Sequence, residues 1–489
     1  MAVPASELDI PLVPLFIDGD RQVRRAALRD IASLSPIART DIGYSALHYD
    51  TVTKVLRDKR WHSAVGFAAQ LAGVTDEKFL ARRRVSILNA EGDTHVRLRR
   101  LVAQAFSPRS ADRLRPFMRE VITGLVDAVA PTGRADVATD ICEPYPIPII
   151  CELLGAPKSD WQLFSRWAND VLEVFSLDMA SKLDLIMRTQ DELEAYTREL
   201  IAQRRSKPAD DLLTDLIAVE EAGDRLSTDE LVMMVNAVIV GGTDTTRNQL
   251  GCAVNLFAEH PEQWAMLADN DDLAPRAVEE AMRYFGAVRG TARFASVDIE
   301  YKGVLFPAGT FMAVGLAEAN RDDTVFRQPE VFDITTQKSE QPQLTFGSGI
   351  HYCLGQALAR AELQEALPLL ARRMPNLRLD GDTGRLRVGD DLVEVHLERV
   401  GASLLEEPRV FQPGLGRRPV ERRDDRHTDA LLDSPKLFQV SIRTERILVQ
   451  RRKIGCRLGV RLGMRLRVVR EAMPLAQNLL LKQRMHDDG

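Results

Sequence analysis

The sequence predicts a mainly α-helical fold with small β-sheets, an α+β arrangement. Apolar residues recur at helical spacing through most of residues 110–225, and a longer apolar helix is predicted over 227–259. Alternating apolar and polar residues at 297–316 and 377–400 predict short strands. The chain has 489 residues, of which 45% are hydrophobic, so it can enclose a large core.

Cysteine content and the first residues of the chain bear on where the protein resides. The five cysteines are odd in number and lack metal-type pairing, which predicts a reducing compartment without a disulfide framework. Residues 1–20 contain four acidic side chains and no long apolar run, so neither a signal peptide nor a membrane anchor is predicted. We therefore expect a soluble, cytoplasmic protein.

Charge is distributed unevenly along the chain. Residues 401–489 contain 19 Lys and Arg against 11 Asp and Glu, a net charge of +8 within a total of −6. Residues 1–400 therefore carry −14. We divide the chain into a 1–400 domain and a basic 401–489 extension, which we expect to be disordered rather than to bind nucleic acid.

A polar helix is predicted around residues 92–102, where His95 and Arg99 lie four residues apart. Side chains at this spacing share one face of a helix. The spacing alone does not distinguish a face that contacts solvent from one that binds an anionic ligand, because charged helix faces usually contact water.

The helix predicted over 227–259 begins with Ser-Thr-Asp-Glu, a capping-box pattern. Its apolar middle changes at 241–246 to Gly-Gly-Thr-Asp-Thr-Thr, residue types that form helices poorly. We expect a kink or a widened turn there, a feature that is often functional. Ala237, Gly241 and Thr245 recur at intervals of four, so one face carries small side chains and lets a large flat group approach.

Glu280 and Arg283 lie three residues apart in a further helical pattern. An exposed pair at this spacing contributes only about 0.3–0.5 kcal/mol. Breaking a buried pair costs roughly 3–5 kcal/mol, so the importance of these residues depends on their burial.

Three glycines surround Cys353 in residues 346–355, Phe-Gly-Ser-Gly-Ile-His-Tyr-Cys-Leu-Gly, and a helical pattern follows at once. Glycine is kept where the chain needs positive φ or close approach to a bulky group. Amides at the start of a helix carry partial positive charge, which favours a thiolate over a thiol. A lone free cysteine is usually a small buried hydrophobic residue. A thiolate held in this way also suits haem iron, on which it favours O–O cleavage.

This ten-residue stretch resembles the haem-binding loop of the cytochrome P-450 family, Phe-Gly-x-Gly-x-His/Arg-x-Cys-x-Gly, with every fixed position present. The resemblance extends over about residues 10–400 and implies a single large haem-thiolate domain of the soluble bacterial type. It implies that Cys353 ligates the iron of haem b. Phe346 would pack beside the sulfur, and His351 would reach a haem propionate.

Two more stretches resemble motifs of the same family. His95 and Arg99 match its His-x-x-x-Arg motif, whose side chains bind haem propionates, and Arg293 aligns with another propionate-binding arginine. Arginine suits this role because its planar fork pairs with a carboxylate through two bonds. Asp244 and Thr245 match the acid–alcohol pair that manages the protons required to cleave dioxygen.

The resemblance also implies a substrate pocket and a structural ion pair. The implied pocket residues are Ala237, Gly241, Ala287 and Val288. Glu280 and Arg283 match the buried Glu-x-x-Arg pair of the family. The usual third member, an arginine before phenylalanine, is replaced here by Val331, which puts the three-residue network in doubt.

The resemblance implies a monomeric haem-thiolate monooxygenase that inserts one atom of dioxygen into a small hydrophobic molecule. Electrons would come from a ferredoxin with its reductase or from a flavoprotein, and no nucleic acid or membrane contact is expected. Four arginines are candidates to meet an acidic partner: Arg99, Arg100, Arg109 and Arg360. Two alternatives stay open, a peroxide-driven peroxygenase and a non-enzymatic haem sensor, neither of which would need the acid–alcohol pair.

Overall fold

The structure, a computed structural model, describes residues 2–13, 21–64, 69, 73–103, 105–132, 135–175, 179–221, 226–336, 339–380, 385–388 and 391–394. These residues belong to one unit of the chain, Met1–Glu407. The extension predicted over 401–489 lies outside the described residues.

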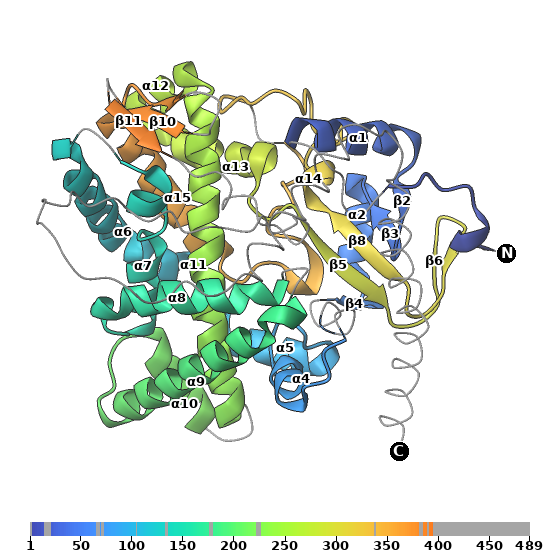
Figure 1. Ribbon diagram of the computed structural model, residues 1–489, viewed down its shortest axis with the longest axis horizontal. Coiled ribbons are helices and arrows are strands. Elements are labelled where there is room, and N and C mark those ends of the chain that lie inside the picture. The colour runs from blue at the N-terminus through green and yellow to red at the C-terminus, as the bar shows by residue number, and fades with distance from the viewer. Residues whose placement is uncertain are drawn as a thin grey trace, which may run out of the picture. The chain divides into compact units, whose positions relative to one another are not determined.

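Helices make up most of the described chain, as the sequence predicts (Figure 1). The α-helices are α1 Arg21–Leu34, α2 Tyr49–Arg57, α4 Glu77–Arg84, α5 Gly92–Val102, α6 Pro108–Val129, α7 Pro146–Leu154, α8 Trp161–Leu172, α9 Leu183–Ser206, α10 Leu212–Glu221, α11 Thr228–Ala258, α12 Pro261–Asp269, α13 Ala274–Phe285, α14 Leu316–Ala319 and α15 Gln356–Arg373. Within the described ranges, no helix combines the length and the apolar composition that a membrane span requires.

Helix α11 is the central element of the largest hydrophobic core (Figure 1). Its 31 residues span about 47 Å at 1.5 Å per residue. The predicted capping box starts the helix: Ser227 N–H donates to the Glu230 carboxylate at 2.9 Å, and Glu230 N–H donates to Ser227 Oγ at 3.2 Å. Helices α7, α8, α13 and α15 pack around it, which explains why most of its side chains are buried.

The 241–246 stretch stays α-helical, so the widened turn predicted there is wrong, and the kink stays a prediction. The hydroxyl of Thr243 donates to the Ile239 carbonyl at 3.0 Å, and that of Thr245 donates to the Gly241 carbonyl at 2.9 Å. Each hydroxyl therefore has its hydrogen-bond acceptor on the preceding turn of the same helix. Packing along a helix of this length outweighs the weak helix propensity of six residues.

The strands of the described residues form three sheets. They are β1 Val3–Pro4, β2 Ile37–Thr40, β3 Gly43–Ala46, β4 Trp61–Ser63, β5 Gly290–Ala295, β6 Ile299–Tyr301, β7 Val304–Phe306, β8 Phe311–Gly315, β9 Arg378–Asp380, β10 Arg385–Val388 and β11 Asp391–Glu394. The largest sheet has the order β2-β3-β8-β5-β4, and the others have the orders β1-β7-β6 and β11-β10-β9. A second core lies between the largest sheet and α2.

The strand predictions are confirmed with one refinement. Strands β6 and β7 form the predicted hairpin, whose turn places Lys302 and Gly303 at positive φ. Strand β8 does not extend this hairpin but pairs antiparallel with β5 in the largest sheet. Strands β9 to β11 lie within the 377–400 segment, of which 381–384, 389–390 and 395–400 are outside the described residues.

Candidate functional site

The cysteine loop takes its shape from two glycines. Gly347 and Gly349 have φ of +72° and +74°, values that side chains with a Cβ rarely adopt. A Cβ on Gly349 would also lie 2.1 Å from the Leu56 carbonyl oxygen. The Cys353 N–H donates to the Phe346 carbonyl at 2.9 Å and closes the loop, and α15 begins three residues later. The loop therefore presents Cys353 at a fixed place, as the sequence predicts.

The surroundings of Cys353 do not by themselves favour a thiolate. Burial raises the pKa of the Cys353 thiol, and the Gly355 N–H with the charges of Arg99 and Arg360 offsets this only in part. The start of the helix acts in the expected direction, because the Gly355 N–H lowers the pKa of Cys353, but desolvation outweighs it in the free thiol. A metal cation bound to the sulfur would supply the missing stabilisation.

Arg99 and Arg360 both contact residues of the cysteine loop. Arg99 donates to the Tyr352 carbonyl, next to Cys353. The guanidinium of Arg360 lies 4.5 Å from the centre of the Phe346 ring and pairs with Glu279. Arg360 therefore packs against the loop and forms an ion pair with Glu279, and its contact with a protein partner stays a prediction.

An accessible stripe of small side chains runs along α11. Gly241 and Thr245 are exposed and Ala237 is partly exposed, although most of this helix is buried. A Cβ on Gly241 would meet nothing within 4 Å. The hydroxyl of Thr246, the next residue, donates to the buried carboxyl of Glu362 on α15, the helix that follows the cysteine loop. The small-residue face predicted from the sequence is therefore open and lies on a helix joined to the cysteine-bearing element.

Asp244 is held by neighbours on its own helix. Arg247 pairs with its Oδ1 and also donates to Asn169 on α8, and Asn248 Nδ2 donates to its Oδ2 at 3.1 Å. Thr245 instead bonds the backbone, so the acid and the alcohol are adjacent but not bonded to each other. Sequence reasoning missed Arg247 and Asn248, although their spacing of three and four from Asp244 is a usable signal.

A histidine–carboxylate cluster lies beside the cysteine loop. The rings of His95 and His351 have centroids 4.4 Å apart, and His351 Nε2 lies 3.0 Å from Glu91 Oε1. Burial acts to raise the pKa of Glu91, but hydrogen bonds from His351 and from the Ser63 N–H outweigh it and lower that pKa. Glu91 was not predicted, because it meets His351 only through the tertiary fold.

Three basic groups, the buried His95 and Arg293 and the half-buried Arg99, form no salt bridge with an acidic side chain among the described residues, although the Glu91 charge acts on the first two. His95 is 2% exposed and its Nδ1 has no hydrogen-bond partner. Arg293 is 5% exposed and donates to the Ala292 carbonyl at 2.8 Å and weakly to Thr291. Burial lowers the pKa of Arg293 to about 10. With Arg99, these groups fit a ligand that brings its own carboxylates, as haem does with its propionates.

His95 leads to a prediction about pH. Burial, His351 and Arg99 lower the pKa of His95 to about 4, against about 6.5 when unfolded. Between these values the unfolded chain binds the extra proton, so the unfolding free energy of haem-free protein should fall by up to about 3 kcal/mol as pH drops from 6.5 to 4.

Denaturant unfolding at several pH values checks this prediction, with His95→Gln as the variant expected to flatten the slope. Haem-loaded protein should show a weaker slope, because a propionate against His95 would raise its pKa. Equal slopes in the haem-free wild type and the variant would contradict the assignment.

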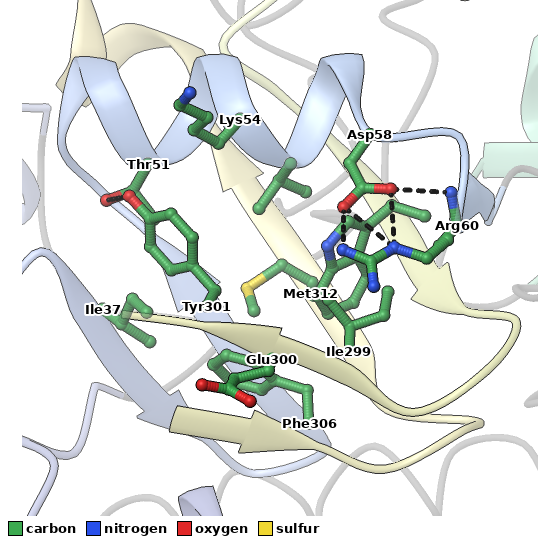
Figure 2. Close-up of a pocket in the computed structure, with 12 residues that line it drawn as sticks. Ile37, Thr51, Lys54, Asp58, Arg60, Ile299, Glu300, Tyr301, Phe306 and Met312 are labelled. Carbon is green, nitrogen blue, oxygen red and sulfur yellow. Dashed lines mark hydrogen bonds and ion pairs between the residues drawn. The ribbon is translucent and has the colours of Figure 1, made fainter. Parts of the chain in front are cut away.

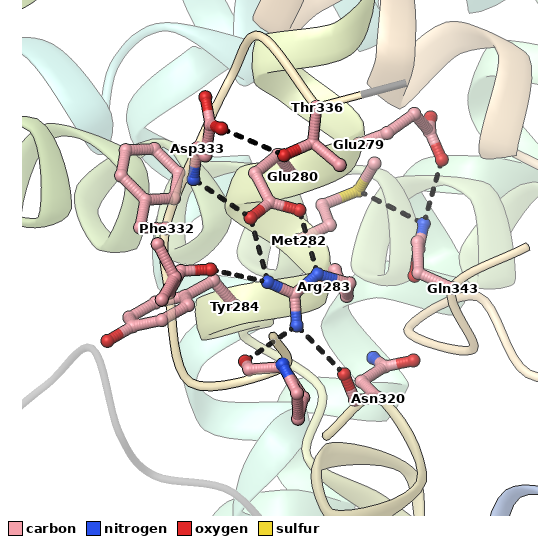
Figure 3. Close-up of polar contacts among 12 residues, drawn as sticks. Glu279, Glu280, Met282, Arg283, Tyr284, Asn320, Phe332, Asp333, Thr336 and Gln343 are labelled. Carbon is pink, nitrogen blue, oxygen red and sulfur yellow. Dashed lines mark hydrogen bonds and ion pairs between the residues drawn. The ribbon is translucent and has the colours of Figure 1, made fainter. Parts of the chain in front are cut away.

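The Glu280–Arg283 pair is buried, as predicted (Figure 3). Arg283 donates to both carboxylate oxygens of Glu280 at 2.7 Å. Its remaining N–H groups reach the carbonyls of Asn320, Pro329 and Val331. Every arm of the guanidinium therefore has a partner.

Backbone groups complete the network that lacks its third arginine. Val331 is 50% exposed, and only its carbonyl takes part, accepting from Arg283 at 3.0 Å. The N–H of Asp333 donates to Glu280 Oε1 at 3.1 Å (Figure 3). The doubt raised by Val331 is thus resolved, because a main-chain donor satisfies the carboxylate.

A separate surface pocket of about 270 Å³ lies between α2 and the strands β6 to β8 (Figure 2). Its floor includes Trp61, Phe306 and Met312, and the ion pair of Asp58 with Arg60 stands at its edge. It contains none of the residues predicted to hold haem, oxygen or substrate. This pocket is therefore not the candidate active site.

Comparisons with known proteins agree with this geometry. The family model described as Cytochrome P450 matches residues 45–374. The chain is 38% identical over 335 residues to Nocardicin C N-oxygenase of Nocardia uniformis subsp. tsuyamanensis, covering 68% of this chain and 82% of that protein. It is 36% identical over 342 residues to Cytochrome P450 monooxygenase PikC of Streptomyces venezuelae, covering 69% and 79%.

Solved structures are similar in fold. The crystal structure of CalO2 has a TM-score of 0.70 at 28% identity and covers 78% of this chain and 99% of that chain. The structure of P450BioI in complex with an acyl carrier protein ligated to hexadec-9Z-enoic acid has a TM-score of 0.68 at 29% identity, covering 76% and 96%.

Proposed function

This chain belongs to the cytochrome P450 family, and from that premise we propose that it hydroxylates a small hydrophobic molecule at a haem bound through Cys353. It is a haem b monooxygenase, an oxidoreductase that uses dioxygen. The observation that carries the finer proposal is the fixed cysteine loop together with the open small-residue stripe on α11. When bound, the haem supplies the iron at which dioxygen is activated.

We assign the haem contacts to the residues around the cysteine loop. Cys353 would bind the iron, and Phe346 would pack beside its sulfur. The propionate partners would be His95, Arg99, Arg293 and His351. The assignment is supported by the burial of His95 and Arg293 and by the absence of a salt bridge to either of them or to Arg99 among the described residues. His351 already pairs with Glu91.

Asp244 and Thr245 would handle the protons. Thr245 is exposed on the open stripe. Its hydroxyl can break its hydrogen bond to the Gly241 carbonyl and bind a water molecule instead. The Asp244 carboxylate would accept a proton from solvent at Oδ2 and pass it on, once Asn248 gives up that oxygen. Arg247 holds Oδ1 and can keep that contact while Oδ2 carries the proton.

The substrate side would be formed by Ala237, Gly241, Ala287 and Val288. These side chains are apolar or absent, which suits a hydrophobic molecule rather than an ion. The similarity to Nocardicin C N-oxygenase supports a small organic compound as the substrate.

Turnover tests separate this proposal from its alternatives. With a ferredoxin, its reductase and dioxygen, the protein should form hydroxylated product from a hydrophobic compound that displaces iron-bound water. Turnover with hydrogen peroxide but never with reductant and dioxygen would favour a peroxygenase instead. Binding of the compound without turnover in either system would favour a sensor.

We further propose that the electron donor docks near the cysteine loop, on α5 and the start of α6, in a cytoplasmic protein. Arg100 and Arg109 are exposed there, and α6 packs against α15. The four cysteines of the described residues are free, which supports a reducing compartment.

Reversing both charges, Arg100→Glu with Arg109→Glu, should raise the ferredoxin concentration for half-maximal reduction by about tenfold at low salt. The loss should shrink as ionic strength rises, because salt screens exposed charges. Stopped-flow reduction against ferredoxin concentration measures this, and Arg100→Lys with Arg109→Lys is the charge-conserving control. An unchanged or salt-independent response would contradict the docking site.

A further inference from the structure

Gln249 is a buried amide on α11, one turn beyond Thr245. Its amide oxygen and amide nitrogen each form a hydrogen bond with the segment that leads from α13 to β5, and we call this pair of bonds the clasp. Oε1 accepts from the Ala287 N–H at 2.8 Å, and Nε2 donates to the Phe285 carbonyl at 3.2 Å. A buried amide costs free energy unless both groups are bonded, so its presence in an apolar helix face indicates a use for these two bonds.

The same segment also contacts the start of the cysteine loop. A Cβ on Gly286 would lie 2.6 Å from Thr345 Oγ1, so this glycine is in close contact with Thr345. The Thr345 hydroxyl donates to the Met282 carbonyl at 2.9 Å and accepts from Asn320 at 3.1 Å. Thr345 directly precedes Phe346, so the segment is fixed between α11 and the loop that carries the cysteine.

We propose that Gln249 is a positioning residue that determines specificity by fixing Ala287 and Val288 relative to α11. The inference rests on the proposed function, because it takes Ala287 and Val288 as substrate contacts. Gln249 and Thr245 are four residues apart on one face of a rigid helix. The clasp therefore sets the distance between the Thr245 hydroxyl and the pocket wall formed by Ala287 and Val288. If the clasp is lost, this distance varies, and rigid ligands should bind less tightly.

The chain provides a matched control. Gln263 on α12 is also buried, and its amide clasps another segment in the same way. Its Nε2 donates to the Phe332 carbonyl at 2.7 Å, and its Oε1 accepts from the Ile334 N–H at 2.9 Å. Gln263→Met removes the same two bonds from a segment that has no part in the proposed pocket.

The test compares Gln249→Met with Gln263→Met in haem-loaded protein. Imidazole and 4-phenylimidazole are titrated optically, since both ligate the iron but only the second fills the space toward the pocket wall. Gln249→Met should raise the Kd of 4-phenylimidazole about tenfold and leave that of imidazole within about twofold. Gln263→Met should change neither, and Gln249→Asn, too short to reach both groups, should behave like Gln249→Met.

Amide hydrogen exchange provides a readout that is independent of ligand binding. In Gln249→Met the Ala287 amide should exchange at least about tenfold faster, while amides inside β5 keep their protection. An unchanged Ala287 rate, or an unchanged ratio of the two Kd values, would overturn the inference. Failure of the wild type to bind either imidazole would instead count against the haem proposal, and the exchange result would still decide the role of Gln249.

Discussion

Thr245→Ala is expected to divert electrons from product to hydrogen peroxide, lowering the product formed per electron consumed by about tenfold or more. The Thr245 hydroxyl is the polar group of an accessible stripe whose other members are Ala237 and Gly241. Removing it leaves no side-chain oxygen on that stripe to hold a proton-donating water. Reductant consumption should continue, because Thr245 is not among the residues that we propose to hold the haem.

Thr243 provides the control for this variant. Its hydroxyl makes the same kind of bond, to Ile239 at 3.0 Å, but its side chain is 1% exposed. Thr243→Val should therefore leave the ratio of product to peroxide close to that of the wild type. If both variants uncouple turnover to the same extent, the effect belongs to the helix and not to proton delivery.

Arg283→Met is expected to lower the free energy of unfolding by about 3–5 kcal/mol and to reduce haem content sharply. The substitution leaves the Glu280 carboxylate buried with only the Asp333 N–H against it. It also leaves the carbonyls of Asn320 and Val331 without their donor. Both losses act on the segment that connects α13 with the cysteine loop.

Arg373 offers an exposed pair for comparison. It bridges to Asp127 with both side chains largely exposed, 40% and 58%. Urea titrations of both variants check this prediction, and Arg373→Met should change the free energy of unfolding by less than about 1 kcal/mol. Adding Glu280→Leu to Arg283→Met should recover part of the loss, because it removes the uncompensated charge. No recovery would mean that the carbonyl contacts, not the ion pair, carry the effect.

Much of the scaffold could be predicted because it depends on neighbours in sequence. The capping box at Ser227 and Glu230, the glycine pattern before Cys353 and the pair of Glu280 with Arg283 are each complete within a few residues. Local patterns of this kind report backbone conformation and helix faces directly.

The partners of the site residues could not be predicted, because they come from distant segments. Glu91 meets His351 across 260 positions of the chain, and Gln249 meets Ala287 across 38. The replacement of an arginine by the N–H of Asp333 is likewise invisible in a sequence pattern, since any residue has that donor. The raised pKa of the Cys353 thiol follows from burial, which only the fold defines.

The carbon monoxide spectrum of the reduced protein tests thiolate ligation by Cys353 most directly. We predict the thiolate-shifted absorbance band in the wild type, and its loss in Cys353→Ser. A band at the position seen in globins for the wild type, or the shifted band persisting in Cys353→Ser, would contradict the assignment.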